Sequence, residues 1–443
     1  MQRLLRIRLQ AMMFLQYFIN GAIIPIFSLY LKQSLHFSGE EVGAVMAMSA
    51  ASAFVAPVLG SLVADRLMRI ERLYSLCLLG GGVLMLLLSY QTGFLAVMLI
   101  YLAYMLVYGS TSAMSTVIAL HHEPDAKRGF GSIRMWGTVG FIAAAWLFGY
   151  LWLSAGGGSL VAERLPDALK LSAIVTLLLG LYALTLPRSP ALLPAGSAAI
   201  PDIGTSMARI PGTAGTGAST LTPSSARRLL PIDSLKVFLD PHVLLFLVMS
   251  FFVWTADSFY YFGASLFLSW KGVATQSIMP LLSIGQMVEV ATMGLLGFLL
   301  TRYGFRRVFI AGAAMEFVRF TILAIGAPFG LVVAGLAVHG FCYGLFFGSA
   351  MIFLDAYSTA STRAGVQQLF TIVTGGFGAL VGNLSAGKVL DAAAASGAGY
   401  RLFWTVPALL TLGVAVVLLI FFRERQGSAV SADRLNGLSD RTR

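Results

Sequence analysis

Six ionisable side chains lie inside stretches that are otherwise apolar enough to cross a lipid bilayer. A charge at that depth costs several kcal/mol or more. Such groups are therefore usually paired with one another or turned toward a watery path for a solute or a proton. The pattern favours a transporter. The six residues are Arg134, Asp257, Glu289, Glu316, Arg319 and His339.

The most direct candidate for proton chemistry is Glu289, near the middle of an apolar stretch. Gln286 precedes it by three residues and shares its face of a helix. A carboxylate shielded from water exchanges a proton near neutral pH more readily than an exposed one. We predict that Glu289 couples a proton to transport; the alternative is an acid held in a structural ion pair. Two further amides, Gln16 and Asn20, are expected to line the same cavity.

Asp257 stands in a mixed polar and aromatic stretch that runs from Trp254 to Tyr261. Aromatic rings can stack on a planar solute while polar tips orient it. We therefore predict that Asp257 faces a substrate cavity and acts as a second proton-coupling residue. The alternative is that Asp257 and Ser258 form only a polar bend in the helix.

Arg134 lies about one turn inside its apolar stretch, close enough to the end to extend its head group into water. Its neighbours favour a cavity instead, because Trp136, Thr138 and Phe141 follow and Gly137 permits close helix contact. A guanidinium in a cavity could donate two parallel hydrogen bonds to a solute or neutralise a carboxylate.

The remaining charged residues have weaker functional signals. Glu316 and Arg319 are three residues apart on one helix face, so we predict a structural pair. His339 could relay protons, although a lone histidine in a glycine-rich helix is more often simply hydrogen-bonded. Asp355 and Arg363 bracket the end of one apolar stretch and could form a cytoplasmic gate pair.

Helices must position these residues. Apolar runs of about 20 residues, each long enough to span ~30 Å of hydrocarbon, recur in a chain that is 58% hydrophobic with a mean hydropathy of +0.83. A β-barrel is excluded, because its strands would be short and alternating. We predict an all-α membrane protein with twelve transmembrane helices, at 9–31, 42–64, 73–90, 95–120, 133–153, 169–187, 237–268, 276–300, 307–326, 329–354, 366–388 and 402–422.

The net charge of +11 reflects topology. With the N-terminus placed inside, the basic residues concentrate in the inside loops, as the positive-inside rule requires. The only basic residues in the opposite loops are Lys32, Arg164, Lys170, Lys271 and Arg401. We therefore expect both termini in the cytoplasm and no nucleic-acid partner.

Cofactor chemistry has no signal in the sequence. The two cysteines, Cys77 and Cys342, both fall in predicted spans, and no metal-ligand spacing occurs. The glycine clusters lack the lysine and threonine of a phosphate loop. The motifs G-x-S-x-G and H-E-x-x-H are also absent. We predict no disulfide, no metal, no cofactor and no enzymatic activity.

One segment interrupts the apolar pattern. Residues 188–236 are rich in Pro, Gly, Ser, Thr and Ala and separate six spans from six. The predicted organisation is therefore an N-terminal six-helix bundle (1–187), a flexible cytoplasmic linker (188–236), a C-terminal six-helix bundle (237–425) and a cytoplasmic tail (426–443).

Short basic turns follow the second and eighth spans, at matching places in the two halves. The first contains Asp65 and Arg66, and the second contains Arg302 and Arg306. Such a parallel repeat resembles the major facilitator superfamily, which implies two six-helix bundles around a central cavity. The first turn has Ser61 where that superfamily usually has a glycine, so the motif is degenerate.

Longer strings resemble the nucleoside–proton symporter family within that superfamily. The resemblance covers nearly the whole chain except the linker and the tail, and the string in the fifth span is its most specific element. The strings are Phe14–Tyr17, Ile133–Phe141, Ser283–Glu289, Arg302–Gly304, Val318–Phe320, Tyr343–Gly344, Gly376–Gly378 and Ser385–Val389.

This resemblance implies a nucleoside pocket between the halves. The family usually has an acidic residue directly after the position of Phe347, where this chain has Gly348. The family's pair of amide residues in the seventh span corresponds to Asp257 and Tyr260 here. These departures bear on which solute is recognised. The positions that match the family's pocket are Arg134, Thr138, Phe141, Gln286, Glu289, Tyr343 and Phe347.

We therefore expect a proton-coupled symporter of nucleosides or a related small polar solute, working by alternating access. The resemblance implies a monomer in a bacterial cytoplasmic (inner) membrane, with a small-molecule substrate, protons and lipid as its partners. A facilitator-type carrier of a sugar, an organic acid or a drug is the first alternative. A membrane sensor that binds solute without transporting it is the second.

Overall fold

The computed structural model describes residues 2–55, 68–123, 126–154, 164–187, 189, 232–359 and 362–423. Asp65 and Arg66, most of the predicted linker and the predicted tail lie outside these ranges. Within them, every regular element is a helix.

The described residues contain ten helical runs long and apolar enough to cross a membrane. One of them, α14 (Thr275–Ile325), holds two helices, because Gly304 in its middle has φ 73° and ψ 169°. The predicted second span is described only in its first part, as α3 (Gly39–Ala47) and its continuation to residue 55. With these two additions the count is the predicted twelve.

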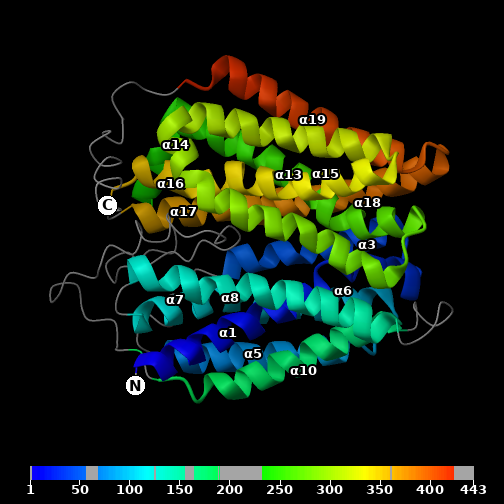
Figure 1. Ribbon diagram of the computed structural model, residues 1–443. Coiled ribbons are helices and arrows are strands. Elements are labelled where there is room, and N and C mark those ends of the chain that lie inside the picture. The colour runs from blue at the N-terminus through cyan, green and yellow to red at the C-terminus, as the bar shows by residue number, and fades with distance from the viewer. Residues whose placement is uncertain are drawn as a thin grey trace.

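The helices form two bundles that lie one above the other in Figure 1. The N-terminal bundle contains α1 (Gln2–Ile23), α2 (Phe27–Leu29), α3, α5 (Ile70–Leu88), α6 (Phe94–Tyr108), α7 (Thr111–His122), α8 (Ala126–Trp146) and α10 (Pro166–Ala183). The C-terminal bundle contains α13 (Pro241–Trp270), α14, α15 (Phe329–Cys342), α16 (Gly348–Ala356), α17 (Arg363–Thr371), α18 (Ala379–Ala395) and α19 (Gly399–Phe421).

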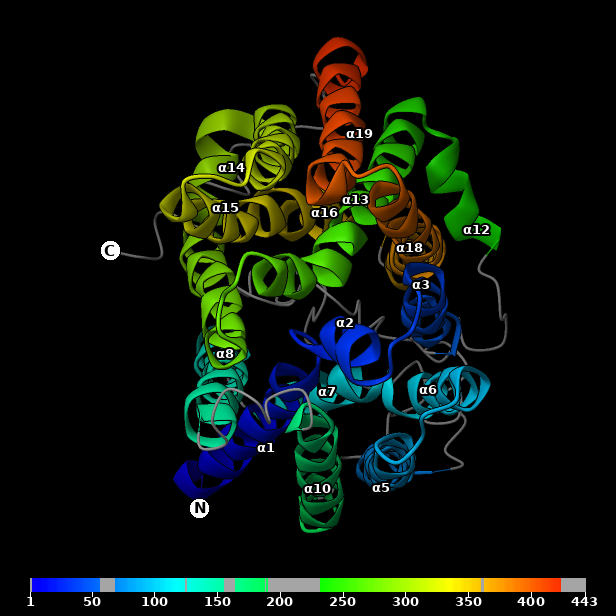
Figure 2. The same ribbon diagram turned by 90° about the vertical axis from the view of Figure 1, so that its right-hand side faces the viewer.

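The helical core begins and ends at the same end of the molecule. Helix α1 begins and α19 ends at the same end of the molecule (Figure 1). Viewed from the opposite end, α3 lies beside α18 at the junction of the bundles, and α8 lies beside α14 (Figure 2). The two bundles therefore meet through the second and eleventh spans on one side and the fifth and eighth on the other.

Local signals in the sequence explain where several helices start. Ser38 caps α3 in a capping box with Glu41, each side chain bonding the other's backbone N–H. Asp240 accepts a hydrogen bond from the His242 amide at the start of α13, and Pro241 occupies its first turn. These caps satisfy amide groups that a membrane helix cannot leave bare.

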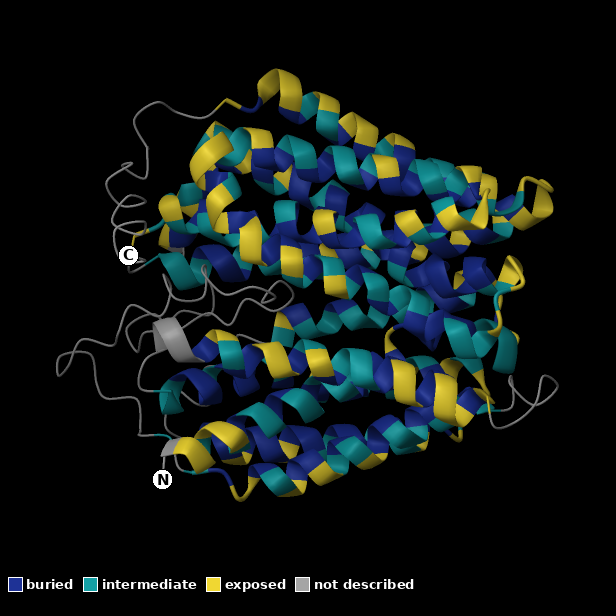
Figure 3. Cartoon of the chain, viewed as in Figure 1, coloured by how far each residue is buried: buried dark blue, intermediate teal, exposed yellow. Residues whose placement is uncertain are grey.

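The outer faces of the helices are apolar and exposed, and the inner faces are buried (Figure 3). Large exposed side chains such as Leu95, Leu151, Leu178, Leu409 and Phe421 are each at least half accessible. A surface of this kind suits hydrocarbon rather than water, because a soluble monomer rarely exposes large apolar patches.

The end of the predicted linker is ordered. Residues 232–236 belong to a helix, α12 (Ile232–Leu235), and to the 3₁₀ turn Lys236–Leu239 that follows it. The Ser234 hydroxyl donates to the Thr362 carbonyl over 3.2 Å, which ties this segment to the start of α17. This short helical segment lies within the last residues of the predicted linker.

Candidate functional site

The N-terminal half of the candidate site is built where α1 and α8 touch backbone to backbone. A Cβ at Gly21 would lie 2.4 Å from the Phe141 carbonyl oxygen, and one at Gly140 would lie 2.1 Å from that of Phe14. Only glycine fits such an approach. The contact fixes Phe141, which is half-buried, on a helix face held against α1.

Arg134 is held inside the protein and does not extend to the membrane surface. Its side chain is 6% exposed, and its guanidinium carbon lies 3.9 Å from the centre of the Tyr17 ring, a cation–π contact. A Cβ at Gly137 would lie 2.6 Å from Arg134 Nη1, so that glycine leaves room for the folded-back side chain. Arg134 could extend its head group into water at the membrane surface or keep it inside the protein, and the structure supports the second interpretation. Thr138, one turn further, is half-buried.

The C-terminal half of the candidate site is built where α14 meets α15. A Cβ at Gly340 would lie 2.3 Å from the backbone nitrogen of Glu289 and 2.5 Å from the Gly285 carbonyl oxygen. Glu289 is buried at this contact, and Gln286 is half-buried. The two residues thus sit on a helix whose position is set by glycine packing.

Charged residues of the two bundles lie within electrostatic range of one another. Glu289 lies within electrostatic range of Arg134 across the junction of the bundles, and also of Asp257. Tyr343 lies within range of Glu289, Asp257 and Arg134. Charged and polar residues from the fifth, seventh, eighth and tenth spans therefore lie within electrostatic range of one another.

Tyr343 and Phe347 mark the two ends of a π-helical turn, Tyr343–Phe347, between α15 and α16. Wider turns of this kind are rare and often lie at functional sites. The two rings are 5.2 Å apart, and Trp254 of α13 meets Phe347 edge-on at 4.8 Å. The arrangement presents three aromatic rings from two spans in one cluster.

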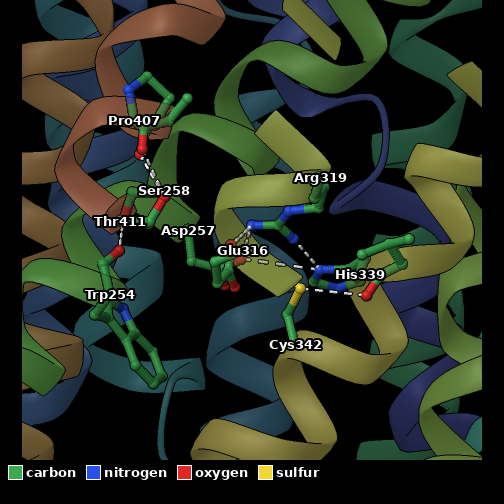
Figure 4. A network of polar contacts seen from close by, with 11 residues as sticks. Trp254, Asp257, Ser258, Glu316, Arg319, His339, Cys342, Pro407 and Thr411 are labelled. Carbon is green, nitrogen blue, oxygen red and sulfur yellow. Dashed lines mark hydrogen bonds and ion pairs between the residues drawn. The ribbon is translucent and has the colours of Figure 1, made fainter. Parts of the chain in front are cut away.

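Next to this aromatic cluster lies a buried charged network, which is drawn in Figure 4. Arg319 Nη2 donates to Asp257 Oδ1 over 2.9 Å and also contacts Glu316 Oε2. Arg319 Nη1 contacts Nδ1 of His339, and the same His339 nitrogen is 3.8 Å from Asp257 Oδ1. All four side chains are at most 4% exposed. We call Asp257, Glu316, Arg319 and His339 the charged network.

Tyr260 packs directly on the charged network. Its ring stacks on His339 with centroids 4.5 Å apart, and Arg319 lies 4.4 Å above it. The Tyr260 hydroxyl is buried and has no hydrogen-bond partner among the described residues. Tyr260 therefore offers a buried hydroxyl beside the charged network.

The sequence analysis identified only part of this network. The predicted pair of Glu316 and Arg319 is confirmed. The interpretation of His339 as a hydrogen-bonded residue rather than a proton relay is consistent with its contact to Arg319. What was missed is that Arg319 is shared with Asp257, which was predicted as a cavity and proton-coupling residue with no named ion-pair partner. The signal available was the placement of all four near the middle of their spans.

The expectation that Gln16 lines the cavity was wrong. Gln16 is fully buried in the N-terminal bundle, where its amide nitrogen donates to Tyr108 and Thr111 at 3.0 Å each. Its amide oxygen accepts from the Tyr74 hydroxyl at 2.8 Å. Asn20 joins the same cluster by accepting from Tyr108 at 3.0 Å. Gln16 therefore serves helix packing, because neighbouring spans supply its partners, whereas Asn20 is half-buried and its place in the cavity stays a prediction.

Several polar contacts hold the bundles together at the end where α3 begins. Both carboxylate oxygens of Asp391 accept from the first backbone amides of α3, Gly39 and Glu40, at 2.8 Å each. Gln33 donates to Ser269 at 2.7 Å, and the Trp146 indole donates to Ser283 at 3.0 Å. These bonds close one end of the junction between the bundles.

Asp355 and Arg363 form an ion pair between α16 and α17, near the end where α1 begins. The predicted pairing is confirmed. Whether the pair gates the pathway stays a prediction, because both residues belong to the same bundle.

Two bundles of helices with apolar outer faces, joined through the second, fifth, eighth and eleventh spans, define a secondary transporter of the major facilitator type. The fold agrees with solved structures: nucleoside transporter NupG superposes with a TM-score of 0.77 at 23% identity, over 95% of this chain and all of that one. A variant of NupG gives a TM-score of 0.78.

A model of the family described as nucleoside H+ symporter matches residues 3–206 and 209–427. The chain belongs to that family, and it is a multi-pass membrane transporter rather than an enzyme. It is 28% identical over 430 residues to the putative nucleoside transporter YegT of Escherichia coli, covering 94% of this chain and 93% of that one. It is 27% identical over 440 residues to the xanthosine permease of the same bacterium, covering 94% and 95%.

Proposed function

We propose that this protein carries nucleosides into the cell together with protons by alternating access. The observation that supports this best is that Arg134 and Glu289, from opposite bundles, lie within electrostatic range of each other, together with the aromatic cluster of Tyr343, Phe347 and Trp254. A nucleoside offers a flat base and a polar sugar, which suit rings and charged hydrogen-bonding groups respectively. Relatives named as nucleoside and xanthosine permeases support the same substrate class.

Each predicted site residue has a role in this proposal. The rings of Phe141, Tyr343 and Phe347 stack on or border the base, and Thr138 and Gln286 provide hydrogen bonds from half-buried positions. Arg134 and Glu289 provide charged hydrogen bonds from opposite bundles, so a bound solute can pull the bundles together. Tyr260 contributes its hydroxyl, and Asp257 acts in proton coupling through Arg319.

Proton coupling by Glu289 follows from its surroundings. In this structure the Arg134 guanidinium lies within electrostatic range of the buried Glu289 carboxylate. When the bundles separate, that charge moves away, and an isolated buried carboxylate is costly unless it takes up a proton. Protonation of Glu289 would thus favour one conformation over the other, which is the differential interaction that coupling needs.

The orientation proposed is the one the basic loops indicate, with both termini in the cytoplasm of a bacterium. The hydrogen bonds that close the bundles at the opposite end, including those of Asp391, then lie on the outside. We propose that the protein works as a monomer in the inner membrane.

The test is uptake of radiolabelled uridine, adenosine and xanthosine into proteoliposomes with an imposed pH gradient. We expect accumulation that collapses when a protonophore removes the gradient. Unlabelled nucleosides should compete, and sugars and organic acids should not. Binding without flux would support a sensor, and competition by sugars alone would show a different substrate class.

The Glu289→Gln variant tests the coupling residue. It should lose accumulation driven by the pH gradient, because the amide cannot exchange a proton. Accumulation that persists in this variant would remove Glu289 from the coupling role.

A further inference from the structure

The charged network contains one more acidic group than its single permanent cation can neutralise. Asp257 and Glu316 both contact Arg319, and an arginine carries one positive charge at any relevant pH. The only further cation that the network could supply is a protonated His339. The protonation of that imidazole therefore decides the charge of the whole network.

The geometry indicates that His339 is neutral. Arg319 Nη1 contacts His339 Nδ1, and a guanidinium nitrogen can only donate a hydrogen bond. Nδ1 must therefore accept with its lone pair, which leaves the ring proton on Nε2. That nitrogen is buried and has no partner among the described residues. With both acids ionised, the network would hold a net charge of −1 inside the membrane.

Glu316 is the acid that this arrangement leaves uncompensated. It is 0% exposed, and its Oε1 has no hydrogen-bond partner in the part of the chain described. Asp257, in contrast, holds the 2.9 Å bond to Arg319. An ionised carboxylate with a bare oxygen in a dry interior is far more costly than a neutral acid.

We propose that Glu316 stores the transported proton, so that the charged network is neutral while it is sealed and releases the proton only when water enters. The inference rests on the proposed proton coupling and adds Glu316 to Glu289 as a second site for the same single proton. The proton leaves the Glu316 carboxyl for a water molecule on the cytoplasmic side, and Arg319 stays bound to both carboxylates. A proton from the outside restores the neutral acid before the network closes again.

Groups that surround Glu316 lie between it and the proposed substrate site. On α13, Tyr260 and Asp257 lie within electrostatic range of Glu316, and on α15 Cys342 does. Tyr261 and Tyr343 pack their rings near His339, at 5.7 and 6.0 Å, and Glu289 is the other acid within range of Asp257. A nucleoside that moves Tyr260 or Tyr343 would therefore disturb the packing that seals the network.

The experiment compares Glu316→Gln with Glu71→Gln in proteoliposomes. Glu71 is also buried, but it lies on α5 and accepts from the Ser189 amide at 2.6 Å, outside the charged network. For one proton per solute, the wild type should accumulate nucleoside about tenfold per unit of imposed pH difference. Glu316→Gln should give a ratio of about one, and Glu71→Gln should behave as the wild type.

Infrared difference spectroscopy tests the stored proton without transport. The wild type should show the band of a buried protonated carboxylic acid, and Glu316→Gln should lack it. Asp257→Asn should also lack it although Glu316 is intact, because one remaining carboxylate is matched by Arg319. This second variant decides the question if Glu316→Gln does not fold.

The outcomes are distinct. A wild type that ignores the pH gradient yet shows the infrared band would overturn the proposed coupling and leave the stored proton standing. Accumulation by Glu316→Gln, or an unchanged band in both variants, would overturn the storage role. Accumulation driven by a sodium gradient instead would mean that a metal cation supplies the missing charge, which also overturns it.

Discussion

Two buried polar clusters among the described residues, one in each bundle, differ in kind. In the N-terminal bundle, Gln16 bonds Tyr74, Tyr108 and Thr111 with ordinary neutral hydrogen bonds of 2.8–3.0 Å. In the C-terminal bundle, the charged network combines two acids, one arginine and a histidine, and leaves Glu316 Oε1 and His339 Nε2 without partners.

The difference shows how to separate structure from function in a membrane protein. A neutral cluster with its donors and acceptors matched stabilises helix packing and gains nothing from a change of protonation. A charged cluster with one unmatched acid is costly unless that acid holds a proton, so such a cluster changes its energy when it gains or loses that proton. Substitutions in the two clusters should therefore produce different kinds of defect.

The largest effect is expected for Arg319→Gln. The substitution leaves the Asp257 carboxylate buried without its cation, and breaking a buried ion pair in this way typically costs about 3–5 kcal/mol. We expect a large loss of folded protein, measured by thermal unfolding in detergent. Lowering the pH should recover part of the stability, because protonated acids are neutral. A variant as stable as the wild type at neutral pH would contradict the charged interpretation of the network.

Gly340→Ala should be the next most damaging. Its Cβ would lie 2.3 Å from the backbone nitrogen of Glu289, so α15 must move away from α14 and carry His339 with it. We expect nucleoside uptake to fall at least about tenfold, since small displacements of site residues are costly. The control is Gly294→Ala on the same helix as Glu289, where a Cβ meets nothing within 4 Å. Equal activity of the two variants would show that the approach of the helices is unimportant.

Gln16→Leu tests the neutral cluster. It removes the acceptor of Tyr74 and a donor to Thr111, and leaving such buried groups unpaired costs about 1–3 kcal/mol. We expect a lower unfolding temperature but an unchanged ratio of protons to nucleoside, measured by simultaneous pH and tracer recordings. A changed ratio would mean that the N-terminal cluster also takes part in coupling.

The smallest effect on stability is expected for Tyr260→Phe. The hydroxyl has no partner among the described residues, so its removal should change the free energy of unfolding by less than about 0.5 kcal/mol. If the hydroxyl binds the nucleoside, the KM should rise about tenfold with little change in proton coupling. An unchanged KM would place Tyr260 in the packing of His339 alone.

The sequence by itself determined the membrane class, the approximate spans, the division into two halves and the pairing of Glu316 with Arg319. These features depend on local quantities: the length of apolar runs, the distribution of basic residues and the spacing of residues on one helix face. Gly304 likewise marked a turn that the structure confirms with its positive φ.

Only the tertiary structure decided which buried polar groups meet between helices. It joined Asp257 of α13 to Arg319 of α14, placed Gln16 in a core rather than a cavity, and brought Arg134 within range of Glu289. The physical reason is that contact with lipid requires only an apolar outer face on each helix. Different pairings of the inward-facing residues therefore give the same apolar pattern in the sequence. Helix rotation and glycine-mediated approach choose among these arrangements, and both are set by packing over the whole bundle.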